Sequence, residues 1–171
     1  MKKLLIAACT VAAVGVMAAP AQAQVQFGVQ ANYAEDVDFG IGARGQFGLG
    51  EMLNAEGGLA DLIGVVSFDY YFWDCSADCS YFEINGNALY PVEVEGSDLA
   101  PYVGGGLNIA RASLDSGVTG VGDVSETDVG LNALGGLNFD LGGFAAFVEA
   151  KIEVGGGEQF VLTFGGLFGS D

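Results

Sequence analysis

Histidine is absent from this 171-residue sequence and positive charge is scarce: five Lys and Arg residues stand against 22 Asp and Glu, a formal net charge of −17. Histidine is the commonest side-chain general base and the commonest metal ligand, so its absence argues against most enzymes. A chain this acidic also lacks the electrostatic footprint of a nucleic-acid-binding protein. We therefore expect no catalysis, no cofactor and no nucleic-acid partner.

Proline is also rare, at 3 residues, and only 16% of the chain is charged, whereas glycine reaches 29 residues and apolar residues 51%. The aromatic and β-branched content excludes a disordered chain. The glycines have no three-residue period, which excludes collagen, and heptads of Ala, Glu, Lys and Leu are missing, which excludes a coiled coil. The length fits one domain.

The first 23 residues read as a secretory signal peptide. Lys2 and Lys3 precede an apolar run, and the small-x-small site Ala21-Gln22-Ala23 ends it. A transmembrane helix is disfavoured because the run is shorter than the ~20 residues that a span needs. Lipoprotein cleavage before Cys9 would leave too short an apolar region. We expect cleavage after Ala23 and a single domain over residues 24–171.

The remaining sequence alternates with a period of two, which is the signature of strands with two different faces. One phase is aromatic or aliphatic, and the other carries Gly, Asn, Gln and Ser with isolated charges. Each alternating segment is near the ~9–11 residues of a tilted membrane strand. The eight segments are 25–33, 37–49, 62–72, 82–92, 99–109, 127–139, 144–152 and 160–168.

The polar phase is too poor in Lys and Glu for a face that meets water, and its small residues suit a narrow interior. The apolar phase then faces lipid, with aromatic residues near both strand ends and small aliphatic residues between them. This pattern predicts an all-β fold: an eight-stranded antiparallel up-and-down transmembrane β-barrel with a side-chain-filled polar lumen, in the bacterial outer membrane. A secreted soluble β-barrel that binds a small ligand stays as the alternative.

Several stretches resemble the outer-membrane protein β-barrel domain family, with its OmpX-like and opacity-type members. Pro101-Tyr102-Val103-Gly104-Gly105-Gly106-Leu107 is similar to a strand entry of these barrels, Phe147–Lys151 to their penultimate strand, and Phe160–Phe168 to their last. The resemblance implies a monomer in outer-membrane lipid with a structural or surface-binding, adhesive role and no catalysis. It also implies insertion by the barrel assembly machinery, which reads a final aromatic residue. This sequence departs from that pattern, because it ends Phe168-Gly169-Ser170-Asp171, so recognition would rest on Phe168.

Two sets of residues are candidates for a site. Cys75 and Cys79 are closely spaced in an exported chain, which favours a disulfide over free thiols or a redox or metal role. The charged residues of the inward phase must find partners in a narrow lumen, because unpaired burial is costly. They form either a structural network or a narrow path for ions or small solutes, and they are Arg44, Asp69, Glu83, Asp128, Glu149 and Lys151.

The links between strands give the outer contact surface. The link Ala112–Glu126 is the longest on the predicted outer side and is the candidate for contact with an extracellular ligand of unknown identity. The acidic stretches 35–38 and 123–128 lack the spacing of an EF-hand, so we expect solvated loops rather than calcium sites. The GxGxxG at 40–45 lies inside a strand, which argues against a dinucleotide site.

Overall fold

The computed structural model describes residues 25–72, 78–94, 99–115, 124–155 and 158–169, and almost all of these residues lie in eight β-strands. The alternation predicts all eight strands and their order, and the structure confirms them. Their bounds are β1 (Val25–Ala34), β2 (Asp38–Gly48), β3 (Ile63–Tyr71), β4 (Asp78–Pro91), β5 (Leu99–Asp115), β6 (Val124–Asp140), β7 (Ala145–Val154) and β8 (Phe160–Phe168).

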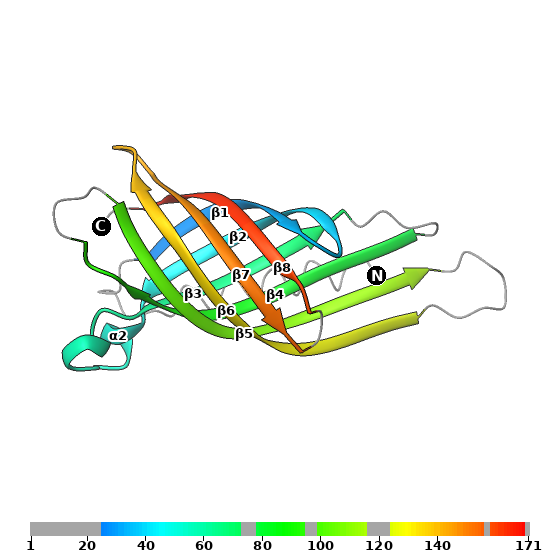
Figure 1. The fold of residues 1–171 in the computed structure, drawn as a ribbon, viewed down its shortest axis with the longest axis horizontal. Helices are drawn as coiled ribbons and strands as arrows, with labels where there is room; N and C mark the ends of the chain where they lie inside the picture. The colour runs from blue at the N-terminus through cyan, green and yellow to red at the C-terminus, as the bar shows by residue number, and fades with distance from the viewer. Residues whose placement is uncertain (1–24, 73–77, 95–98, 116–123, 156–157, 170–171) are drawn as a thin grey trace.

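The strands form a closed barrel in which each pairs with its sequence neighbours and β1 pairs with β8 (Figure 1). Every pair is antiparallel, so the connectivity is up-and-down. An even number of strands places the start of β1 and the end of β8 at the same end, which we call the termini end. The opposite end is called the far end. Closure gives every strand of the barrel body two neighbours and leaves no edge there.

The outward face is apolar, as predicted. Its exposed side chains include Val29, Ile41, Val66, Leu107 and Phe164. Aromatic rings gather near both ends: Phe39 and Phe72 stack near the far end, and Phe144 and Phe168 stack near the termini end. A large continuous apolar surface of this kind is covered by lipid in a membrane barrel.

Three strands continue beyond the closed body at the far end. The pairing of β4 with β5 extends to Asp78 and Asp115, and the pairing of β5 with β6 extends to Leu114 and Val124. By contrast β7 pairs with β6 only from Leu131 onward. In Figure 1 the ends of β4, β5 and β6 reach past the remaining strands. We call residues 78–80, 111–115 and 124–130 the projecting sheet.

The projecting sheet corrects the predicted link Ala112–Glu126. Both of its bounding residues are strand residues, paired with one another across β5 and β6. Residues 116–123, the central part of that link, lie outside the described residues. Polar side chains replace apolar ones on the outward phase here, so the end of the apolar pattern does not mark the end of the strands.

At the termini end, the link between β6 and β7 is a short turn, as predicted. Gly142 adopts a left-handed φ of 80° and its backbone N–H donates to Asp140 at 2.7 Å. The longer link between β2 and β3 contains a short helix, α2 (Leu49–Met52), and a 3-10 turn, η1 (Gly57–Leu59). No helix in the described part of the chain is both long and apolar enough to span a bilayer.

Candidate functional site

Polar and charged side chains fill the middle of the lumen. Each lies on the inward phase of its strand, so the barrel closes around a polar layer surrounded by lipid-facing apolar residues. Asp69 is its most heavily hydrogen-bonded member. One carboxylate oxygen accepts from Gln30 and Asn32 at 2.6 Å each, and the other accepts from Ser67 at 2.8 Å and Asn85 at 3.2 Å. Four neutral donors thus hold one buried anion.

Arg44 and Glu149 form an ion pair toward the termini end. Arg44 Nη2 lies 3.1 Å from Glu149 Oε2, and both side chains are almost fully buried. Tyr102 donates to the same carboxylate oxygen at 2.9 Å, and the guanidinium lies 4.4 Å from the centre of the Phe147 ring. The pair joins β2 to β7 across the lumen, and removal of either partner would leave a buried charge without compensation.

Lys151 is the cation of the far-end half. Its ammonium lies 2.5 Å from Glu153 Oε1 and 3.5 Å from Glu83 Oε2. Gln159 links the two carboxylates, because its amide nitrogen donates to Glu83 at 2.7 Å and to Glu153 at 2.8 Å. Tyr81 also donates to Glu83 at 2.8 Å. This group therefore places two carboxylates around one ammonium.

Asparagine amides connect these groups. Asn132 Nδ2 donates to Asn85 Oδ1 and Asn87 Oδ1 at 2.9 Å each. Lys151 donates to the same oxygen of Asn85 at 3.2 Å. Because Asn85 also donates to Asp69, the polar layer is continuous from β1 to β7. Such a network ties opposite walls of the barrel together.

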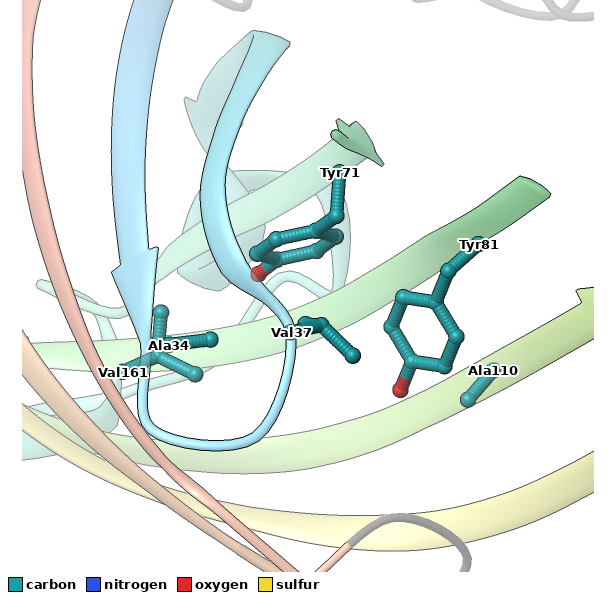
Figure 2. Close-up of a cluster of buried hydrophobic side chains, with 6 residues drawn as sticks. All are labelled: Ala34, Val37, Tyr71, Tyr81, Ala110 and Val161. Atoms are coloured by element: carbon teal, nitrogen blue, oxygen red, sulfur yellow. The ribbon is translucent and has the colours of Figure 1, made fainter. Parts of the chain in front are cut away.

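Apolar layers close the lumen above and below the polar layer. At the far end, Figure 2 shows the rings of Tyr71 and Tyr81 with Val37 beside them, over the small side chains of Ala34, Ala110 and Val161. The two rings meet edge to face with centroids 5.5 Å apart. Toward the termini end, Val65, Leu89, Tyr102 and Leu134 pack together. The lumen of the barrel body is thus filled with side chains, as an eight-stranded barrel requires.

Two glycines allow this close packing. A Cβ atom at Gly42 would overlap the carboxylate of Asp69, and one at Gly165 would overlap the ring of Phe147. Both glycines lie on the inward phase, and each is the direct cross-strand partner of the residue whose side chain it accommodates. Any larger residue at either position would displace a member of the buried layer.

Five of the six charged residues expected in the lumen lie there: Arg44, Asp69, Glu83, Glu149 and Lys151. Asp128 is the exception, because its side chain is exposed on the projecting sheet although it lies on the inward phase. The neighbouring strand β7 ends its pairing at Leu131, so no lumen exists at the level of Asp128. Cys75 lies outside the described residues, so its disulfide with Cys79 stays a prediction.

Sequence reasoning missed the inward-facing apolar residues and two polar ones. Tyr71, Tyr81, Tyr102 and Phe147 all lie on the phase that was described as small or polar. Glu153 lies on the same phase, so the alternation alone is enough to predict that its side chain faces the lumen. Gln159 precedes β8 in a link, and no periodic signal marks it. Among the described residues, no group of three or more Cys, Asp and Glu side chains could hold a metal ion.

The comparisons with known proteins identify the family. The sequence pattern of the outer membrane protein beta-barrel domain matches residues 6–160, which is most of the chain. The chain therefore belongs to this family, and it is a protein of the bacterial outer membrane. The match begins inside the segment expected to be the signal peptide. No curated protein sequence matches the chain.

Solved structures show the same architecture at low sequence identity. Neisserial surface protein A aligns with a TM-score of 0.62 at 19% identity, over 86% of this chain and 97% of that one. The N-terminal β-barrel domain of Pseudomonas aeruginosa OprF aligns with a TM-score of 0.56 at 16% identity, over 86% and 98%. Ail of Yersinia pestis, the attachment invasion locus protein, aligns with a TM-score of 0.50 at 13% identity, over 86% and 95%. These likenesses concern the fold.

Proposed function

We propose that this protein is a non-enzymatic outer-membrane barrel that binds a partner at the cell surface through its projecting sheet. The barrel body is the membrane anchor, and the far end faces outward. The observation that carries the proposal is the open edge of β6. Residues 124–130 pair with β5 on one side, and no strand in the described ranges pairs with them on the other.

An open strand edge presents unpaired backbone N–H and C=O groups, which another chain can join as an added strand. The seven residues of the β6 edge span roughly 23 Å at the rise of a β-strand. Their side chains through Val129 are all exposed, so nothing among the described residues covers them. Main-chain pairing would supply affinity, and the alternating side chains would supply specificity.

The charge of the projecting sheet selects the class of partner. Glu126 and Asp128 are exposed on it, and its one cation, Arg111, donates to Thr127 at 3.0 Å and to Ser125 at 3.1 Å. We expect an extended segment of a basic protein. Ail has been crystallised with the heparin analogue sucrose octasulfate. A sulfated polyanion does not suit this sheet, because its acidic side chains would repel it.

A narrow pore for ions or solutes is the weaker candidate. The polar layer lies between two apolar layers, and the ring of Tyr81 closes the far end together with that of Tyr71 (Figure 2). A conducting path would need both layers to move. The packed lumen therefore favours an anchoring role for the barrel body.

The remaining expectations complete this proposal. Residues 1–23 are a signal peptide removed on export, residues 24–171 are the barrel domain, and the barrel assembly machinery inserts the chain as a monomer with Phe168 as the aromatic signal. Cys75, in the outer link between β3 and β4, forms a disulfide with Cys79 at the start of β4. The spacing of the two cysteines, four residues apart in an exported chain, supports that pairing.

The test uses a synthetic extended peptide of alternating lysine and valine as the probe. The protein in lipid nanodiscs should bind it, and a protein with Glu126→Lys and Asp128→Lys should bind it at least about tenfold more weakly, because two opposite charges become like charges. The same peptide with proline at alternate positions cannot add to a strand edge and is the control ligand.

Cells that display the protein should adhere to a surface coated with the probe, and cells that display the double variant should adhere less. Equal binding by the variant, or equal binding of the proline peptide, would contradict the proposal. A matched control is Glu93→Lys with Glu51→Lys at the termini end, which carries the same charge change away from the projecting sheet.

A further inference from the structure

The buried charges of the lumen do not cancel. Among the described residues, four carboxylates are buried, those of Asp69, Glu83, Glu149 and Glu153, against only two cations, Arg44 and Lys151. Glu149 is paired with Arg44, and Asp69 is held by four neutral donors. Two negative charges are therefore left uncompensated. One lies on Asp69, and the other falls on Glu83 and Glu153, which share the single ammonium of Lys151.

The polar layer also holds more acceptors than donors. Five buried amide oxygens have no hydrogen-bond partner among the described residues: those of Gln30, Asn108, Asn132, Asn138 and Gln159. Asn108 is the extreme case, because its side chain is fully buried and neither its oxygen nor its nitrogen has a partner. A fully buried amide without a partner points to a group that occupies the space beside it.

The register places these groups next to the carboxylate pair. Asn132 lies opposite Glu153 across β6 and β7, and Asn108 lies opposite Asn85 across β4 and β5. Asn85 is the residue whose oxygen accepts from both Lys151 and Asn132. Asn108 and Asn132 thus lie on the inward phase of β5 and β6, next to the strands β4 and β7 that carry Glu83 and Glu153.

Three species could satisfy these groups, and only one both neutralises the charge and serves the unpaired oxygens. Water supplies donors but no charge. A proton on one carboxylate supplies charge but a single donor. A cation neutralises the pair and also takes several oxygen ligands. We propose that the lumen binds one alkali cation, sodium or potassium, between the Glu83–Glu153 pair and the amide oxygens of Asn108 and Asn132.

The charge sum selects a monovalent ion. Two carboxylates against one ammonium leave one negative charge to be neutralised. A divalent cation prefers several carboxylate ligands, and the described residues offer no cluster of three acidic side chains. Lys151 lies within ion-pair distance of both carboxylates, and its ammonium would repel a divalent ion more strongly than a monovalent one.

The experiment measures unfolding of the full protein in detergent micelles at constant ionic strength. Sodium chloride is replaced stepwise by the chloride of N-methylglucamine, whose bulky cation does not fit a packed lumen. Each sample is refolded in its final buffer so that the ion can enter. Raising sodium from its Kd to a hundredfold excess should raise the folding equilibrium constant about fifty-fold. Calcium chloride alone should not replace sodium.

Two variants locate the site. Glu153→Gln removes the uncompensated charge, and Gln159→Lys supplies a fixed ammonium at the position from which Gln159 already contacts both carboxylates. Both variants should lose the sodium dependence. Gln159→Lys changes a link residue, so it remains informative if the strand variant does not fold. Glu126→Gln on the projecting sheet removes the same charge outside the lumen and should keep the dependence.

The outcomes separate the alternatives. Sodium dependence in the wild type and in Glu126→Gln, lost in Gln159→Lys, supports the proposal. Equal stability of the wild type in sodium and in N-methylglucamine would overturn it. So would a wild-type stability that responds to pH but not to the cation, since a proton would then hold the pair. Retention of the sodium dependence in Gln159→Lys would place the ion elsewhere and also overturn it.

Discussion

The projecting sheet continues strands of the barrel body with the same alternation. The two regions differ, however, in whether the side chains on the inward face are buried. In the body, inward side chains such as Asn132 and Glu149 are buried in a hydrogen-bonded layer. Four and six residues before Asn132 on the same strand β6, the inward side chains of Asp128 and Glu126 are exposed. Alternation decides which face a side chain takes, whereas closure of all eight strands decides whether that face is buried.

The difference also separates two roles. The body is a closed barrel covered by lipid outside, and each of its strands is paired on both sides, so it has no free backbone edge. The projecting sheet lies beyond closure, and the edge of β6 remains open. Matched substitutions in the two regions should therefore differ strongly.

The largest difference is expected for the two arginines. Arg44→Met should lower the free energy of unfolding by about 3–5 kcal/mol, because it leaves the buried carboxylate of Glu149 without its cation. Arg111→Met removes an exposed side chain with two hydroxyl partners and should change it by less than about 0.5 kcal/mol. Urea unfolding in detergent measures both. Equal losses would mean that Arg44 reaches solvent.

Two valines with the same exposure test the lipid boundary. Val29 and Val124 are each 63% exposed, the first in the middle of β1 and the second on the projecting sheet. Val29→Arg should cost about 2–4 kcal/mol because it places a cation in hydrocarbon. Val124→Arg meets water and should cost almost nothing. Refolding yield into vesicles gives a second readout, and equal tolerance at both positions would contradict the assigned boundary.

Two aspartates test the buried layer itself. Asp69→Asn keeps the shape but turns two acceptor oxygens into one acceptor and one donor, so donors from β1 or β4 lose their partner. We expect a loss of about 1–3 kcal/mol in the free energy of unfolding. Asp128→Asn should fall within about 0.5 kcal/mol of the wild type. The comparison would fail if thermal or urea unfolding ranked the two variants in the opposite order.

The sequence could predict the faces but not the strand ends. Period-two alternation is imposed by strand geometry, so the inward position of Arg44 or Glu83 could be read directly. Arg111 and Thr127 break the apolar outward phase, and this break marks the exit from lipid, not the last backbone hydrogen bond. The strands continue past it to Asp115 and Val124.

The partners inside the lumen could not be predicted. Arg44 and Glu149 are brought together by closure of β1 onto β8, which places β2 and β7 across a narrow lumen. Tyr71 and Tyr81 are direct partners on the neighbouring strands β3 and β4, and their rings meet edge to face inside the lumen, although both look like ordinary strand residues in the sequence. The buried position of Gln159 could not be predicted, because this residue lies in a link between strands, where side chains do not alternate between two faces.

The smallest effect is expected for the two cysteines, of which Cys79 lies in the projecting part of β4. Mass spectrometry of unreduced protein should show two hydrogens fewer than the dithiol form. Replacing Cys75 and Cys79 by serine should leave the barrel folded and change its unfolding little, because the closed ring is short. Alkylation of both thiols without reductant would contradict the disulfide.

Residue-resolved amide hydrogen exchange in lipid nanodiscs tests the difference between body and projecting sheet most directly. Amides of β6 from Leu131 to Asn138, paired on both sides, should all be protected. Between Val124 and Gly130, the amides directed at β5 should be protected and the alternate ones should exchange freely. Addition of the lysine–valine peptide should slow those alternate amides. Uniform protection of residues 124–130 in the protein alone would show that the edge is covered and would contradict the account.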